Sequence, residues 1–219
     1  ILYRPTGESG DFEKANFPIG VEGGKTSTCP TQNLMEAYDM KDGTPFVWNN
    51  QSNPYDNRDP RMKYTIVCNE MKWPVDPVEI WEGGTNGLPL QNATTTGYYL
   101  KKYVNNTISF EAGSTVTKKQ HNWVLFRYGE ILLNYAEAMI NAFHDPNYKD
   151  AVYNMSAREA VNQIRGRTNI SLPGFPSDIT EKDFVKRLKN ERRVELAFEG
   201  HRFWDVRRWK ELGQTANIY

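Results

Sequence analysis

Carboxylates and guanidinium groups alternate through residues 191–209, ERRVELAFEGHRFWDVRRW. Two carboxylates about 5–10 Å apart in a cleft could supply the acid and the base of a glycoside hydrolase. Here, however, arginines flank the glutamates, and a neighbouring guanidinium lowers a carboxyl pKa, which makes a poor general acid. Glu195 and Glu199 also stand in an apolar run, where a charge is tolerated only beside an opposite charge. We therefore expect ion pairs that hold helices together, and no catalytic residues.

The expected ion network pairs Arg192 or Arg193 with Glu195 or Glu199, and Arg202 with Asp205, through bidentate hydrogen bonds. Removing one partner of such a buried pair costs about 3–5 kcal/mol. The network residues are Glu191, Arg192, Glu195, Glu199, Arg202 and Asp205.

A second carboxylate-rich stretch, NPYDNRDPRM at residues 53–62, resembles a self-ordering turn. The carboxylate oxygens of Asp56 and Asp59 are of the type that ligates calcium. We instead expect Arg58 or Arg61 to bind Asp56 or Asp59.

Tryptophans in the first half of the chain lie outside any periodic run. A pyranose ring has an apolar C–H face and a rim of hydroxyls, so a flat aromatic ring with polar groups nearby can bind it. The tryptophans at 73 and 81 flank the segment PVDPVEI. The alternative for each tryptophan is that it anchors its loop to the helices. The ligand-binding candidates are Trp48, Trp73, Trp81, Glu82 and Asn86.

Charge and composition exclude several classes of function. The 219 residues hold 27 Lys and Arg against 27 Asp and Glu, so no overall positive field attracts nucleic acid or an anionic membrane. His and Cys side chains are few and scattered, so we expect no metal site and no cofactor. No window of about 18 apolar residues could span a bilayer. Whether Cys29 and Cys68 form a disulfide stays open.

Residues 1–122 and 123–219 differ in the elements they predict. The first region is rich in Gly, Pro, Asn, Asp and Thr, which favour ordered loops, with strands predicted at Lys63–Cys68 and Tyr98–Val104. Long irregular segments with this aromatic content are typically functional, so we assign the ligand surface to residues 1–122.

Helical periodicity begins at Trp123 and predicts one helix over residues 123–143. A second helix is expected at Ser156–Arg165, and a third follows PGFPSD with Thr180 as its N-cap. Residues 123–219 therefore form a helical scaffold. The fold class is mostly α, with tetratricopeptide-like helix pairs (an α-α superhelix), long irregular loops and a few short β-strands. We expect one continuous domain, a fragment of a longer protein.

Several blocks of the chain resemble the SusD/RagB family in the family's order. In the second half these are FRYGEILLNYAEAM, AVNQIRGR and NERRVELAFEGHRFWDVRRW. In the first half they are TQNLMEAYDMKDGTP, NPYDNRDPRM and GYYLKKYV. The resemblance covers about residues 30–209 and is closest to the C-terminal portion of the family.

The resemblance implies a surface-exposed lipoprotein of the outer membrane that binds a glycan, or a peptide, for delivery to a SusC-like TonB-dependent transporter. It implies no enzymatic activity. Two other functions stay open: a tetratricopeptide-like module that binds a partner protein, and a surface glycoside hydrolase with two loop carboxylates across a cleft.

Overall fold

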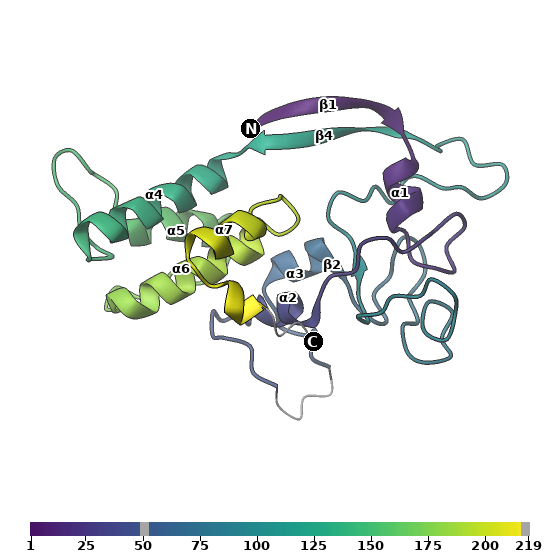
Figure 1. Ribbon diagram of the computed structural model, residues 1–219, viewed down its shortest axis with the longest axis horizontal. Helices are drawn as coiled ribbons and strands as arrows, with labels where there is room; N and C mark the ends of the chain where they lie inside the picture. Colours follow the sequence, from purple (N-terminus) through teal and green to yellow (C-terminus); the bar gives the residue numbers. More distant parts are fainter. Residues whose placement is uncertain (49–52, 216–219) are drawn as a thin grey trace. The chain divides into compact units, whose positions relative to one another are not determined.

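The computed structural model describes residues 1–48 and 53–215 and divides into two compact units (Figure 1). The helical unit comprises Ile1–Leu2, Glu36–Arg61 and Val124–Ala216. The loop unit comprises Tyr3–Met35 and Met62–Trp123. The fold class expected from the sequence is confirmed, because helices joined by long loops dominate and the strands are few.

Three helices build the core of the helical unit: α4 (Tyr128–Phe143), α5 (Ala157–Arg165) and α6 (Glu181–Glu195). They lie side by side at the left of Figure 1. Ala136, Ala160 and Val161 are fully buried between them, and side chains this small let helices approach closely. Leu133 and Phe184 fill the remaining space. The helix α7 (Arg202–Arg208) and the short 3-10 helix η1 (Leu212–Thr215) follow.

The helix predicted to begin at Trp123 begins instead at Tyr128. Residues up to Phe126 extend into strand β4 (Lys119–Phe126), which pairs with β1 (Leu2–Ser9) in a largely exposed ribbon. Leu125 in the strand and Tyr128 in the first turn of the helix are 46% and 63% exposed. Aromatic and β-branched residues in this stretch suit a strand as well as a helix, and periodicity does not separate the two. The C-terminal end is as predicted, with His144 in the left-handed conformation at φ 56°.

Helices α5 and α6 begin at side-chain caps that the sequence displays. The Ser156 hydroxyl accepts from the Glu159 amide, and the Glu159 carboxylate accepts from the Ser156 amide, which is a full capping box. Thr180 caps α6 by accepting from the Asp183 amide. Each cap satisfies an amide that the helix itself cannot.

The loop unit has a separate core around a minimal sheet. The strands β2 (Ile66–Val67) and β3 (Tyr99–Leu100) pair antiparallel, with Ile66 opposite Leu100. Phe17, Trp73 and Val78 pack against them. The helix α1 (Asp11–Asn16) lies in this unit, whereas α2 (Gln32–Ala37) and α3 (Pro60–Thr65) cross the boundary between the units.

Both strands predicted in the loop region are shorter than expected. The helix α3 takes the first half of Lys63–Cys68, because a proline at its first position is preorganised to start a helix. A turn with Tyr103 at φ 69° ends the second strand early. Cys29 and Cys68 are not joined in a disulfide.

Replacing Ser156 by alanine tests the cap of α5. We expect Ser156→Ala to lower the free energy of unfolding by about 1 kcal/mol, because the Glu159 amide loses its acceptor. Urea denaturation measures the change, and Ser177→Ala, at an exposed position, is the control. Equal stability of the two variants would contradict the role of the cap.

Candidate ligand-binding site

Two glutamates on one face of α6 form the centre of a buried ion network. Glu191 and Glu195 are separated by one helical turn and are 2% and 4% exposed. Glu195 accepts hydrogen bonds from Arg61 (2.9 Å), Arg127 (2.6 Å) and Arg167 (2.8 Å). These arginines come from the first turn of α3, the residue before α4 and the segment after α5. One carboxylate therefore ties three segments of the chain to α6.

The remaining contacts extend the network. Glu191 accepts from Arg61 and, at 2.8 Å, from Arg165 at the end of α5. Asp59 binds the other side of Arg61 at 2.7 Å, as the sequence predicts for that turn. Arg127 also donates to Glu199 at 2.7 and 2.8 Å. A Cβ atom on Gly129 would lie 2.8 Å from the Arg127 guanidinium, so glycine leaves room for these bonds.

The network holds its carboxylates in the ionised form. Burial would raise the pKa of Glu195, but the guanidinium groups of Arg61, Arg127 and Arg167 outweigh it and lower the pKa to about 2. The pKa of Glu191 is also lowered, because Arg61 and Arg165 overcome the cost of its burial. A carboxyl group held in this way does not donate a proton near neutral pH.

A second cluster forms where α7 meets α4. Asp205 accepts from Arg192 at 3.1 and 3.2 Å and from Arg208 at 2.8 Å. Glu137 in α4 accepts from Arg208 and, at 2.8 Å, from the indole of Trp209. The Arg192 guanidinium also donates to Asn134 of α4 at 2.7 Å.

The ion partners therefore differ from those that the sequence suggests. Arg192 lies about 100° around α6 from Glu191 and binds Asp205, so it does not hold Glu195 as expected. Arg202 was expected to bind Asp205, but Arg192 and Arg208 occupy that carboxylate. The arginines that hold the α6 glutamates are distant in sequence and were missed: Arg61, Arg127, Arg165 and Arg167.

Arg193 and Arg202 have no ion pair or hydrogen bond with the residues that the structure describes. Burial, together with the nearby positive charge of Arg202, lowers the pKa of Arg193 to about 10. Both arginines line a groove of about 560 Å³ in the helical unit. Its wall is formed by one face of α6, by α7 and by the segment that begins at Glu36. We call this cavity the α6 groove.

The α6 groove also contains a carboxyl group with a perturbed pKa. Burial raises the pKa of Asp39 to about 6, although Arg165 and Arg187 act to lower it. The Asp39 carboxylate lies 3.5 Å from the Arg165 guanidinium and 3.7 Å from that of Arg187. Asp39 therefore changes its charge at mildly acidic pH.

Glu36, which lines the α6 groove, holds the Trp48 side chain beside the groove. The indole nitrogen donates to the Glu36 carboxylate at 2.6 Å. The Phe46 ring, which also lines the groove, contacts Trp48 edge-to-face with centroids 5.1 Å apart, and the Arg58 guanidinium lies 3.7 Å from the Phe46 centroid. Trp48 nevertheless remains 54% exposed. A preoriented and accessible indole of this kind can stack on a ligand.

The other candidates lie in the loop unit and divide into two groups. Trp73 is only 6% exposed and packs in the core, with the Lys101 ammonium 4.9 Å from its ring, so it anchors its loop and offers no face to a ligand. Asn86 is buried too: its side chain accepts from the Glu79 amide and donates to the Ile19 carbonyl. In contrast, Trp81 is 47% exposed and Glu82 is exposed. The structure thus leaves Trp81 and Glu82 as accessible side chains on a loop that Asn86 secures.

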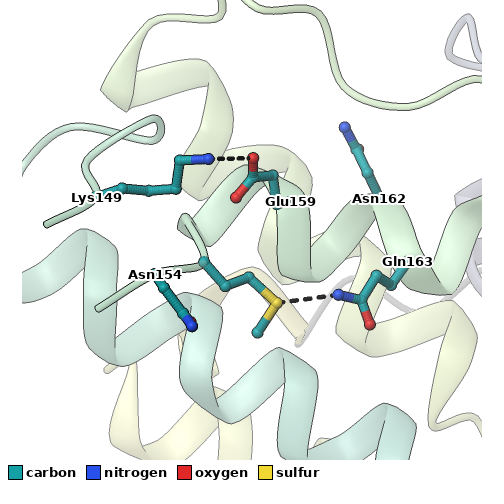
Figure 2. Close-up of a pocket in the computed structure, with 6 residues that line it drawn as sticks. Lys149, Asn154, Glu159, Asn162 and Gln163 are labelled. Atoms are coloured by element: carbon teal, nitrogen blue, oxygen red, sulfur yellow. Dashed lines mark hydrogen bonds and ion pairs between the residues drawn. The ribbon is translucent and has the colours of Figure 1, made fainter. Parts of the chain in front are cut away.

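A second cavity, of about 630 Å³, lies beside α5 (Figure 2). Its polar groups largely satisfy one another. The Lys149 ammonium points toward Glu159 at 2.8 Å, and the Gln163 amide donates to the Met155 sulfur at 3.0 Å. Asn162 bonds the backbone of Phe175. The residues that line this cavity include no aromatic ring, so it is less suited to a sugar than the α6 groove.

Metal and membrane sites are not found in residues 1–48 and 53–215. No three His, Cys, Asp or Glu side chains there gather closely enough to hold a metal ion. Among the helices of the same ranges, none combines the length and apolar character needed to cross a bilayer.

Comparison with known proteins identifies the fold. The family model of the SusD family matches residues 6–219. The chain belongs to the SusD family. A SusD-like protein of Formosa agariphila is 37% identical over 91 residues, which are 39% of this chain and 16% of that protein.

Two solved structures from Bacteroides fragilis cover 96% of the chain, each at 27% identity. One, a SusD-like protein, gives a TM-score of 0.75, and the other, a SusD-like carbohydrate-binding protein, gives 0.78. The chain spans 43% and 41% of their lengths. It therefore corresponds to about two fifths of these SusD-family structures.

Glu195→Gln tests the ion network. The pKa of Glu195 is about 2 in the folded protein and 4.5 in the unfolded chain, so its stabilisation is complete above pH 4.5 and is lost as the pH falls toward 2. We expect the variant to lose about 3–5 kcal/mol at pH 7, because each of three guanidinium groups loses a carboxylate partner. The difference from the native protein should shrink as the pH falls below 4.5. Urea denaturation at several pH values measures it.

Glu181→Gln is the matched control, because Glu181 pairs with His144 at the surface, where an ion pair contributes little. A loss in Glu195→Gln that is no larger than in this control, or that does not vary with pH, would contradict the proposed network.

Proposed function

We propose that this chain is part of a SusD-family protein that captures glycans reversibly and without catalysis. The observation that carries the proposal is the exposed indole of Trp48, fixed by Glu36 beside the α6 groove, in a chain that belongs to the SusD family. A solved relative described as carbohydrate-binding supports a saccharide as the ligand. An oligosaccharide is favoured over a peptide, because the groove combines a flat ring with many polar groups.

The chemistry of such capture needs only stacking and hydrogen bonds. The indole face covers the apolar C–H face of a pyranose ring, and charged and amide groups of the groove bind its hydroxyls. Asn190 and Lys186 are groove residues of this kind. Because Glu36 already orients the indole, little conformational entropy is lost on binding.

Several features support binding rather than hydrolysis. The glutamates of α6 are ionised and hydrogen-bonded to arginines, so they are not available as acid catalysts. In the groove, the Glu36 carboxylate holds Trp48 and the Glu211 carboxylate holds Lys189 at 2.6 Å. The proposal predicts no release of reducing ends from any bound polysaccharide.

We further propose that the whole protein is a surface lipoprotein of the outer membrane that delivers its ligand to a SusC-like TonB-dependent transporter. This part of the proposal follows from the SusD family alone. Genetic linkage to a TonB-dependent barrel and co-purification with it are the measurements that test it.

A second candidate function is a protein-interaction module. It is favoured by apolar side chains that α4 and α7 leave exposed: Tyr128, Ile131, Phe203 and Trp204 are between 49% and 66% exposed. A function of this kind would use these side chains and would not depend on Trp48 or Trp81.

Tryptophan variants distinguish the two functions. We expect Trp48→Ala to weaken binding of the recognised glycan at least about tenfold, or about 1.4 kcal/mol, with little change in stability, because the exposed indole contributes contact area and no core packing. Trp81→Ala tests the loop unit in the same way. Calorimetric titration against glycans first identified on an array measures both.

Trp73→Ala is the control for packing. Trp73 lies in the core of the loop unit, so its removal should cost about 3–5 kcal/mol of stability. Glycan affinity that is unchanged in both Trp48→Ala and Trp81→Ala would overturn the assignment of the ligand surface.

A further inference from the structure

The α6 groove concentrates positive charge in a chain whose net charge is zero. Its lining includes six basic side chains and three acidic ones. The basic residues are Lys182, Lys186, Arg187, Lys189, Arg193 and Arg202, and the acidic ones are Glu36, Asp39 and Glu211. A concave surface with an excess of one sign raises the local concentration of ions of the opposite sign.

Arg193 and Arg202 differ from the other arginines of α6 and α7. Arg192 and Arg208 bind Asp205, and Arg187 donates to the Gly43 carbonyl at 3.0 Å. For Arg193 and Arg202, the described residues provide neither a carboxylate within 4.0 Å nor a hydrogen bond. Both are partly buried and close enough to repel each other. Glu36 attracts Arg193, and Glu211 and Asp205 attract Arg202, but none of these carboxylates forms an ion pair with either guanidinium. An anion that bridges the two guanidinium groups would relieve their mutual repulsion.

We propose that Arg193 and Arg202 bind the carboxylate or sulfate group of an acidic saccharide in the α6 groove. The planar fork of a guanidinium matches both anions, with two parallel hydrogen bonds to two oxygens. This inference rests on the proposed glycan-binding function and specifies its substrate class.

The aromatic residues beside the groove favour an acidic sugar over other anions. Phe46 lines the groove, and Glu36 joins the groove to Trp48 through a 2.6 Å hydrogen bond. An inorganic ion would bind the two arginines but would make no stacking contact with Phe46 or Trp48. The carboxylates of Glu36, Asp39 and Glu211 lie among the basic side chains of the groove. They would repel the phosphate groups of a nucleic acid or of an anionic membrane.

Calorimetric titration of the full chain with matched pairs of saccharides tests this inference. One pair is an oligogalacturonate and its fully methyl-esterified form, which tests the carboxylate. The other is a sulfated carrageenan oligosaccharide and its desulfated form, which tests the sulfate. We expect at least tenfold tighter binding of the charged member of one pair, and we expect this preference to decrease with increasing salt.

Arginine variants locate the anion. Arg193→Gln and Arg202→Gln should each reduce the preference for the charged member at least fivefold. Arg207→Gln, which removes the same charge from an exposed arginine of α7 that donates to the Phe203 carbonyl and lies over the Phe203 ring, should leave the preference unchanged. Neither groove arginine has an ion pair or hydrogen bond to lose among the described residues, and each variant removes the repulsion between the two guanidinium groups. Both variants should therefore unfold at or above the temperature of the native chain.

The outcomes separate the two proposals. Binding of neutral and charged members with equal affinity would overturn the anion site and leave glycan capture intact. Absence of binding to any glycan on the array would overturn both. An equal effect of Arg207→Gln would show a general charge effect and contradict the assignment of Arg193 and Arg202, as would a large loss of stability in either groove variant.

Discussion

The helical unit depends on the neutralisation of two buried carboxylates. Glu191 and Glu195 stand where helix α6 would otherwise bury apolar side chains, and guanidinium groups from three other segments surround them. Once the carboxylates are buried, each arginine has a fixed place, because an unpaired charge in that interior is costly. The network therefore specifies how Arg61, α4 and α5 meet α6 with directional bonds, whereas the alanine-rich contacts between the helices specify only how close the helices come.

Two faces of helix α6 have different roles: one packs in the ion network, and the other lines the α6 groove. On the first face, the carboxylates of Glu191 and Glu195 are ionised and hydrogen-bonded to arginines, so they are not available as acid catalysts. Arg193 and Arg202 lie in the groove instead, without a carboxylate of their own among the described residues. A protein that holds two such cations together gives up some stability, and a bound anion restores it.

The sequence predicts the local features of the fold well and the long-range ones poorly. The caps at Ser156 and Thr180 use residues three apart, so their partners are visible in the chain. The arginines that hold Glu195 are up to 134 residues away, and nothing in a linear pattern distinguishes Arg61 from other arginines of the chain. Exposure is also a tertiary property: Trp73 and Trp81 occur in similar loop sequence, but one is core and the other is accessible.

The ion network of the helical unit requires that the α6 carboxylates are ionised, and a carboxyl titration by carbon-13 NMR measures their ionisation directly. With selectively labelled glutamate, the resonance of Glu195 should titrate with a pKa of about 2, far below the value of 4.5 of a solvated glutamate. A pKa of 4.5 or above for Glu195 would show that the arginines do not hold this carboxylate and would contradict the account.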